Sequence, residues 1–236
     1  AGLRPSESAG FHGHALALGS ADVTLLDLTN AYRMLANGGR LGALRWQPEG
    51  PAAKAAAPAS APRVFDSTVA YIVADILADP AARATTFGLD SPLVTRGWAA
   101  VKTGTSKDLR DNWCIGFTDR YTVGVWVGNA SGAPMHGVSG VSGAAPVWRE
   151  VLAFLHDGAP SRAPAPPAGL VAGVGAHAGE WFVAGTAPSA IGRVQATQPF
   201  GITSPRDGSL FVLDPDIPMA AQRLVFEGAP GRWSLD

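Results

Sequence analysis

Cysteine, charge and long apolar runs are all scarce in this sequence. Cys114 is the only cysteine among the 236 residues, so no disulfide can form within the chain, and its apolar surroundings indicate an inert core thiol. Charged residues account for 16% of the chain and leave a formal net charge of −1. The sequence therefore lacks the excess of basic residues that is typical of nucleic-acid-binding proteins. No apolar run approaches the roughly 20 residues that cross a bilayer. Neither nucleic-acid binding nor a membrane span is predicted.

Signatures of metal and phosphate binding are missing as well. His12 and His14 flank a glycine, but no cysteine or carboxylate stands at ligand spacing from them, so we expect a loop there. The Gly-x-x-x-x-Gly-Lys-Ser/Thr frame of a phosphate-binding loop does not occur. We therefore predict no metal site and no cofactor.

Apolar residues make up 47% of the chain, which is enough for a core in one large domain or two small ones. Thr24, followed three residues later by an aspartate, predicts a helix start, and Asn37 with two glycines predicts its end. A second helix is predicted to be capped by Asp66 or Ser67 and to end before Pro80. We expect this second helix to bury an apolar stripe formed by Val69, Ile72, Val73, Ile76 and Leu77.

Three consecutive strands are predicted at the centre of the chain. The first ends just beyond Val101, and the other two, residues 113–117 and 121–128, are joined by a link of hairpin length. Asp111 and Asn112 stand before the second strand, where we expect them to make the hydrogen bonds of a turn.

Two glycines of the last strand, Gly124 and Gly128, fall on one face and leave room for a helix. We expect the helix that begins at Pro146 to lie against this face. The predicted fold class is therefore α+β, with an antiparallel sheet packed with helices.

A change in composition divides the chain near its last third. Residues 159–168 are rich in proline and alanine, which indicates a semi-rigid linker. Residues 169–236 lack helical periodicity and predict a small all-β, sandwich-like module. Its expected strands are residues 179–183, 192–195, 208–213 and 223–227.

Lys102, Thr103, Gly104 and Thr105 carry the clearest candidate chemistry. The two threonines alternate along a strand, so both hydroxyls point to the same face and can meet one carboxylate. Gly104 lets a ligand approach the backbone closely. We expect Lys102 to lie at a sheet edge beside a cleft for an anionic ligand. Taken by itself, the tripeptide also fits an ordinary strand end with a solvated lysine.

The Lys-Thr-Gly tripeptide is one of three motifs of penicillin-binding proteins and serine β-lactamases. Residues 102–113, 121–129 and 138–148 together closely resemble the transpeptidase domain of class A bifunctional penicillin-binding proteins, in particular the 1C kind. Residues 18–33 resemble the helix that follows the second motif in that kind, and parts of residues 202–218 resemble its appended C-terminal module.

The resemblance implies that residues 1–158 are the C-terminal part of a transpeptidase domain, and that residues 169–236 are the appended module, cut short at its end. It implies acyl transfer on the D-Ala-D-Ala stem peptides of peptidoglycan, at the periplasmic face of the inner membrane in a membrane-anchored protein. In that reaction Lys102 is the cation beside the nucleophile and, with the Thr103 and Thr105 hydroxyls, binds the substrate carboxylate. Gly104 leaves room for the substrate, and the Thr105 amide donates to the oxyanion. β-Lactams would be trapped at the same site.

Two motifs of the family do not occur in this sequence. No serine is followed three positions later by lysine, and there is no Ser-x-Asn. In the family both lie on the N-terminal side, so we expect an upstream part of the domain to supply them and the chain alone not to acylate. A sheet without its upstream helices exposes apolar surface, so we expect association or docking of that missing half.

Two other functions stay open. A D,D-carboxypeptidase or β-lactamase-type hydrolase shares the Lys-Thr-Gly strand and would release D-alanine without cross-linking. A non-catalytic module would bind cell-wall material or other cell-wall proteins through the C-terminal part of the chain.

Overall fold

The structure, a computed structural model, describes residues 3, 7, 9–46, 61–88, 90–188, 202–204 and 227–228. Contacts divide the chain into two compact units, Ala1–Ala187 and Pro188–Asp236. In the second unit the described residues form two short antiparallel strands, β6 (Ile202–Ser204) and β7 (Glu227–Gly228). The strands predicted at residues 192–195 and 208–213, and residues 223–226 of the last predicted strand, lie outside the described residues, so the sandwich-like module stays a prediction.

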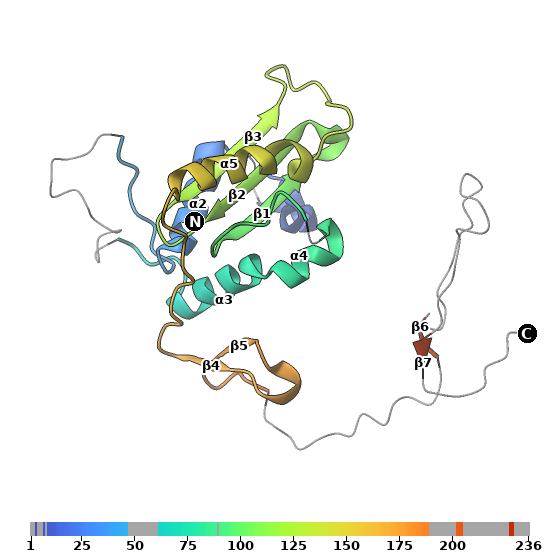
Figure 1. Ribbon diagram of the computed structural model, residues 1–236. Coiled ribbons are helices and arrows are strands. Elements are labelled where there is room, and N and C mark those ends of the chain that lie inside the picture. Colours follow the sequence, from blue (N-terminus) through green and yellow to red (C-terminus); the bar gives the residue numbers. More distant parts are fainter. Residues whose placement is uncertain are drawn as a thin grey trace, which may run out of the picture. The chain divides into compact units, whose positions relative to one another are not determined.

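A three-stranded antiparallel sheet organises the first unit (Figure 1). Its strands are β1 (Ala100–Thr105), β2 (Asp111–Phe117) and β3 (Thr122–Gly128), in the order β1-β2-β3. The register places Thr103 opposite Cys114 and Cys114 opposite Val125. Short connections between consecutive strands produce this order.

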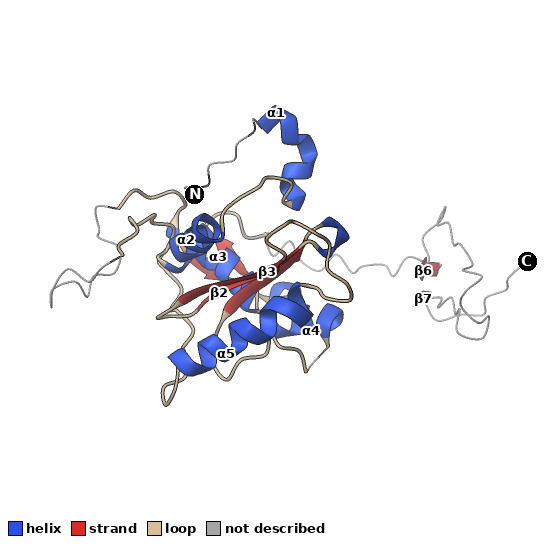
Figure 2. Cartoon of the chain, turned by 90° about the horizontal axis from the view of Figure 1, so that it is seen from above, coloured by secondary structure: helices blue, strands red, loops and turns tan. Residues whose placement is uncertain are grey.

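Helices cover both faces of the sheet (Figure 2). α2 (Leu25–Ala36) and α3 (Ser67–Ala78) lie on one face. α5 (Ala145–Leu155) lies on the other and follows directly on η3 (Gly140–Ala144), a π-helical turn. Further elements of this unit are α1 (Ala9–His12), η1 (Gly13–Leu18), α4 (Pro80–Phe87), η2 (Lys107–Leu109), β4 (Leu170–Ala172), η4 (Gly175–His177) and β5 (Trp181–Val183). The predicted α+β class is confirmed. Among the described residues, no helix has both the length and the apolar character needed to cross a membrane.

Side-chain caps begin the two helices that the sequence predicts. Thr24 Oγ1 accepts a hydrogen bond from the Asp27 amide at 3.1 Å, at the start of α2. Asp66 Oδ1 accepts from the Thr68 amide at 2.9 Å, at the start of α3. This backbone hydrogen bond holds the pKa of the Asp66 carboxyl below its usual value. Both predicted helix starts are confirmed.

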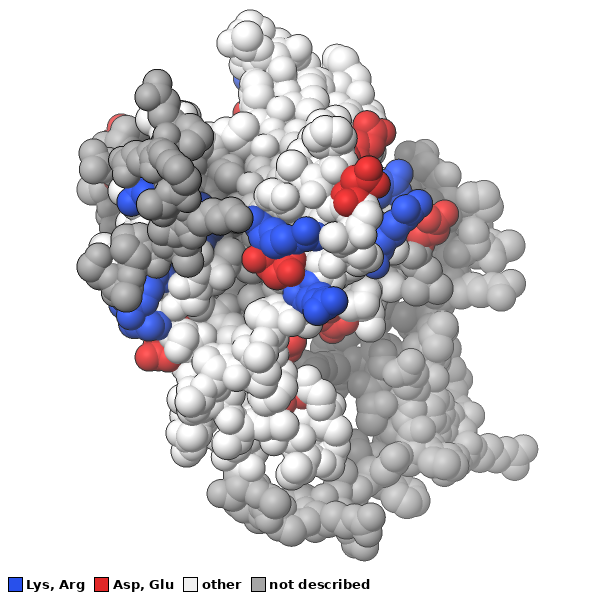
Figure 3. All heavy atoms as spheres, turned by 60° about the vertical axis from the view of Figure 1, so that its left-hand side comes forward, with Lys and Arg blue, Asp and Glu red and all other residues white. Residues whose placement is uncertain are grey.

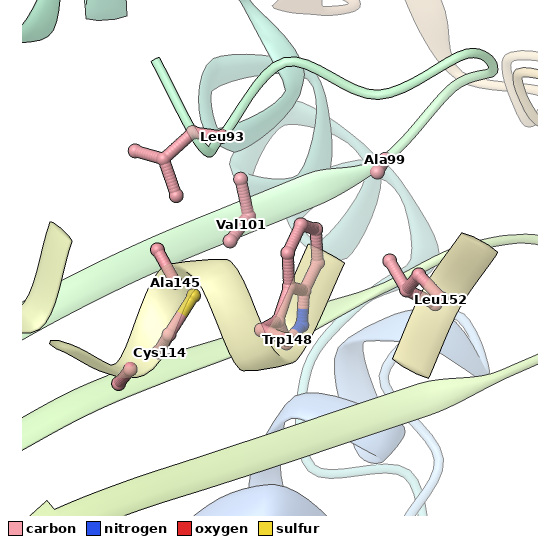
Figure 4. Packing of buried hydrophobic residues seen from close by; sticks show 8 residues of the cluster. Leu93, Ala99, Val101, Cys114, Ala145, Trp148 and Leu152 are labelled. Carbon is pink, nitrogen blue, oxygen red and sulfur yellow. The ribbon is translucent and has the colours of Figure 1, made fainter. Parts of the chain in front are cut away.

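A tryptophan from α5 fills the space between that helix and the sheet (Figure 4). Trp148 is 0% exposed and packs in one cluster with Val101 of β1, Cys114 of β2 and Leu152 of α5. Gly116 of β2 gives the indole room, because a Cβ at that position would lie 2.6 Å from Trp148 Cζ2. The core therefore depends on one large side chain set against a glycine.

The buried face of α3 differs from the predicted apolar stripe. Val69 and Ile76 are exposed, Ile76 by 65%, whereas Ala70 and Ala74 are buried. The small Ala74 lets α3 approach β1 closely, where it packs with Ala100 in one cluster. The predicted stripe is therefore wrong at these positions, because close approach to the sheet selects small residues rather than branched ones.

The glycine face of β3 is covered by α2 and not by the helix that follows Pro146. A Cβ at Gly124 would lie 2.0 Å from Thr29 Oγ1 and 3.1 Å from Leu25 Cδ1, both on α2. The valines of the opposite face, such as Val123, pack against the cluster around Trp148. The glycine face of β3 exists as predicted. The prediction that α5 covers it was wrong, because α2 lies there.

We expect Gly124→Ala to lower the free energy of unfolding by about 1–3 kcal/mol, the usual cost of overpacking. The added methyl group would collide with the Thr29 hydroxyl. Thr29→Ala removes that hydroxyl, which has no hydrogen-bond partner among the described residues, and should recover part of the loss in the double variant. Urea unfolding followed by circular dichroism measures all four proteins. Strictly additive effects would show that the two residues do not touch.

Cys114 is fully buried, and burial raises the pKa of its thiol to about 12. This confirms the inert core thiol expected from the sequence. We expect iodoacetamide to leave the folded chain unmodified at pH 8.5 and to alkylate Cys114 completely in urea. Equal rates in the two states would contradict the burial.

The same pKa difference makes stability depend on pH at the alkaline end. In the unfolded chain a cysteine ionises near its ordinary value of about 8.5. The folded thiol holds its proton up to about pH 12. The contribution of Cys114 to the free energy of unfolding is therefore fully present below pH 8.5 and is lost as the pH rises toward 12.

The proline-rich stretch after α5 runs along the first unit. Ser161 Oγ donates a hydrogen bond to the Trp98 carbonyl at 2.6 Å, and the Trp98 amide donates to the Ser161 carbonyl at 3.3 Å. Beyond it, the β4–β5 hairpin packs on α3 through an edge-to-face contact of Tyr71 with Trp181, 5.7 Å between ring centroids. The predicted domain limits at residues 158 and 169 stay predictions.

Candidate active site

β1 carries the four predicted site residues along an edge of the sheet. Within the described residues this strand pairs with β2 alone. Because side chains alternate along a strand, Thr103 and Thr105 share the face of Val101, which packs under α5. Lys102 and Gly104 lie on the opposite face, the one that α2 and α3 cover.

The backbone of β1 offers hydrogen-bonding groups at its open edge. The Ser106 amide donates to the Asp111 carbonyl at 2.9 Å. In an antiparallel pair every second residue bonds to the partner strand, so Gly104 turns its backbone groups toward β2. The amides and carbonyls of Thr103 and Thr105 therefore face away from β2.

Lys102 extends along that open edge. Its side chain is exposed, and Nζ donates a hydrogen bond to the Thr103 carbonyl at 2.7 Å. Cavities of about 650 and 170 Å³ in the first unit are lined by other residues. The cleft expected beside Lys102 corresponds to neither of them. An exposed ammonium at an open strand edge remains free to turn toward an anion.

Thr105 has a partner that the sequence did not predict. Its Oγ1 accepts a hydrogen bond from the Gly140 amide at 2.9 Å, across 35 positions of sequence. Gly140 is the first residue of η3, which lies over the ends of β1 and β2. Only the abundance of glycines in this stretch hinted at a close approach.

The connection between β1 and β2 is held by Asp111. The Asp111 amide donates to Ser106 Oγ at 2.9 Å, and Ser106 Oγ donates to Asp111 Oδ2 at 2.9 Å. Trp126 Nε1 donates to Asp111 Oδ1, also at 2.9 Å. The turn role predicted for Asp111 is confirmed.

Asn112 differs from its prediction. It is fully buried within β2 and stands opposite Thr105. Its Nδ2 lies 4.0 Å from Met135 Sδ, and its Oδ1 has no hydrogen-bond partner among the described residues. Asn112 therefore belongs to the packing beneath η3 and not to the turn, because its buried side chain makes none of the hydrogen bonds that close the turn.

On one face of the described part of the chain, surface charge does not single out another site. On the face shown in Figure 3, positive and negative side chains lie next to each other on a mostly uncharged surface. A search of the described residues finds no group of three or more His, Cys, Asp or Glu side chains that could hold a metal ion.

Several known proteins are similar to this chain. No family model matches the chain. Penicillin-binding protein 1C of Escherichia coli strain K12 is 36% identical over 141 residues, which cover 60% of this chain and 17% of that protein. Penicillin-binding protein 1A of Neisseria lactamica is 32% identical over 178 residues, and that of Neisseria gonorrhoeae is 31% identical over 191 residues. These three relatives are penicillin-binding proteins.

Both the 1A and the 1C kind are among these relatives, which supports the class A penicillin-binding protein family without separating the 1C kind. The two Neisseria alignments cover 69% and 75% of this chain and 21% and 23% of the respective proteins. The chain thus spans less than a quarter of the length of these curated relatives.

A solved structure shares the fold. The 2.6 Å crystal structure of penicillin-binding protein 1A from Haemophilus influenzae matches with a TM-score of 0.58 and 23% sequence identity, over 75% of this chain and 34% of that one. At this identity the likeness establishes the arrangement of helices and antiparallel strands alone.

Proposed function

We propose that this chain supplies the Lys-Thr-Gly strand of a peptidoglycan D,D-transpeptidase. The observation that carries the proposal is the open edge of β1, where an exposed Lys102 ammonium lies beside backbone groups that face away from β2. The homology to penicillin-binding proteins supports it. More specifically, we propose that the protein is a class A penicillin-binding protein of the 1C kind.

The proposed substrate is a stem peptide that ends in D-Ala-D-Ala. Its terminal carboxylate would accept hydrogen bonds from the Lys102 ammonium and from the hydroxyls of Thr103 and Thr105. The Thr105 amide, at the open edge, would donate to the oxyanion that forms at the penultimate carbonyl. Donors fixed in advance at such a position are worth about 3 kcal/mol each in acyl-transfer enzymes.

Gly104 supports a close approach by the substrate. A Cβ at this position would lie 3.7 Å from Trp113 Cβ, which is an ordinary contact distance. The packing of the protein itself therefore does not require glycine here. A ligand that runs along the β1 backbone supplies the reason.

The nucleophile of the proposed reaction lies outside this sequence, which contains neither Ser-x-x-Lys nor Ser-x-Asn. In the proposed step the serine oxygen bonds to the penultimate carbonyl carbon and the terminal D-alanine leaves with a proton. An amine of a second stem peptide then takes the acyl group. We place this reaction at the periplasmic face of the inner membrane, in a membrane-anchored protein whose C-terminal module binds other cell-wall proteins.

Labelling with a fluorescent penicillin tests the proposal. The natural protein that carries this chain together with its Ser-x-x-Lys segment should become covalently labelled, whereas the 236-residue chain alone should not. A natural protein without that segment, or one that takes up no label, would refute the proposal and favour the binding-module alternative.

Product analysis separates transfer from hydrolysis. With a disaccharide-pentapeptide polymer as substrate, we expect cross-linked dimers along with free D-alanine. Release of D-alanine without any dimer would assign the strand to a carboxypeptidase instead.

A further inference from the structure

The π-helical turn η3 meets the candidate site at one hydrogen bond. The Gly140 amide donates to Thr105 Oγ1 at 2.9 Å, and Gly140 is buried. A Cβ at position 140 would lie 2.5 Å from the Gly104 carbonyl oxygen and 2.7 Å from the Trp113 carbonyl oxygen. Both are backbone atoms, so they cannot rotate away as a side chain can. Only glycine brings this amide so close to β1.

This hydrogen bond restricts what the Thr105 hydroxyl can do. A hydroxyl group has one proton and two acceptor lone pairs, and it rotates to suit its partners. With one lone pair engaged by Gly140, the side chain is held in one rotamer and its proton stays available for donation. Thr105 is exposed, so an anion can reach that proton from outside.

The core fixes the position of Gly140. Ser142 Oγ accepts a hydrogen bond from the amide of Ser139, the N-cap residue of η3, at 2.9 Å. This bond fixes the first turn of η3. η3 then continues into α5, whose Trp148 is fully buried beneath the sheet. The Gly140 amide is therefore held by packing that is already in place before any ligand binds.

We propose that Gly140 is a positioning residue whose amide orients the Thr105 hydroxyl so that its proton is donated to the ligand carboxylate at the open edge of β1. This inference rests on the proposed transpeptidase function and deepens it. It assigns to η3 a role in binding the carboxylate, in addition to its role in packing.

A double-mutant cycle on penicillin acylation tests the inference in the natural protein that carries this chain. Gly140→Ala is expected to slow acylation about tenfold, the lower end of the range for one hydrogen bond to a charged group. Thr105→Val removes the hydroxyl and should slow it by a similar factor, whereas Thr105→Ser should keep most of the rate. In the Thr105→Val background, Gly140→Ala should change the rate less than about twofold.

The outcomes separate this inference from the proposed function. An equal slowing by Gly140→Ala in both backgrounds would overturn the positioning role, while a slow Lys102→Ala variant would leave the function standing. If the unchanged protein is not acylated at all, the function fails and the inference fails with it.

Hydrogen exchange provides a second test that does not depend on the folding of Gly140→Ala. In the 236-residue chain, valine at position 105 keeps the shape of threonine and removes the acceptor. Exchange of the Gly140 amide should accelerate about two- to tenfold in Thr105→Val, by loss of one hydrogen bond, and remain near its original rate in Thr105→Ser. An unchanged Gly140 rate in Thr105→Val would contradict the hydrogen bond on which the inference is built.

Discussion

The Lys102→Ala variant is expected to be acylated by penicillin about 10 to 150 times more slowly than the unchanged protein, since hydrogen bonds to charged groups contribute about 1.5–3 kcal/mol. The Lys102 ammonium lies at the open edge of β1, next to the Thr103 carbonyl. Removing it leaves the carboxylate of the drug without its cation. The measurement is the second-order rate constant for labelling by a fluorescent penicillin, in the natural protein that carries the chain.

Lys107→Ala is the matched control. Lys107 is also an exposed lysine, five positions further on in η2, outside the predicted site. Its replacement should change the rate less than about twofold, because an exposed charge that does not contact the ligand is largely screened by salt. Equal slowing by the two substitutions would show that overall positive charge matters and that Lys102 has no specific role.

Trp148→Ala is expected to lower the free energy of unfolding by about 3–5 kcal/mol, because it empties the largest buried volume of the core. Trp148 is 0% exposed and contacts both β1 and β2 through one cluster. Urea unfolding of the 236-residue chain, followed by circular dichroism, measures the loss. A domain at the low end of ordinary stability, about 5 kcal/mol, would keep only about 0–2 kcal/mol after this change.

The same helix supplies the control. Phe154 lies on α5 six residues after Trp148 and is 82% exposed. Phe154→Ala should change the free energy of unfolding by less than about 0.5 kcal/mol. If Phe154→Ala costs as much as Trp148→Ala, the face of α5 that the structure buries is not the face that stabilises the fold.

Local signals in the sequence predicted the parts of the fold that local interactions determine. The caps at Thr24 and Asp66 are contacts within three residues, so the residue types alone identify them. The antiparallel order of the strands follows from short links such as residues 118–120. The α+β class could therefore be predicted before the structure was known.

Packing between distant segments could not be predicted in the same way. Whether Gly124 faces α2 or α5 depends on where each helix crosses the sheet, and alternation along the strand says only that the two faces differ. In α3, the close approach to β1 selects Ala74 for the interface and leaves Ile76 exposed. A stripe of large apolar residues is a poor guide when close packing requires small ones.

In the candidate site, too, the sequence predicted the local features and missed the contacts between distant segments. Lys102 and its neighbours were found because they are consecutive and form a known motif. Gly140 was not found, because its contact with Thr105 spans 35 positions and depends on a π-helical turn. Asn112 was assigned to the turn because it follows Asp111, although its side chain is buried beneath η3.

Two large apolar side chains, Phe154 of α5 and Ile76 of α3, are largely exposed on helices that cover opposite faces of the sheet. Single exposed apolar side chains are common on folded proteins, whereas contiguous apolar patches mark interaction surfaces. The expected docking of an upstream part of the domain, or self-association of the chain, stays a prediction.

The most direct test of the account is a crystal structure of the penicillin adduct of the natural protein. We expect the drug carboxylate to lie within about 3.2 Å of the Lys102 ammonium and of a Thr103 or Thr105 hydroxyl, the range of a hydrogen bond. We also expect the drug carbonyl oxygen to accept a hydrogen bond from the Thr105 amide. An adduct whose carboxylate is bound elsewhere, with Lys102 still on the Thr103 carbonyl, would contradict it.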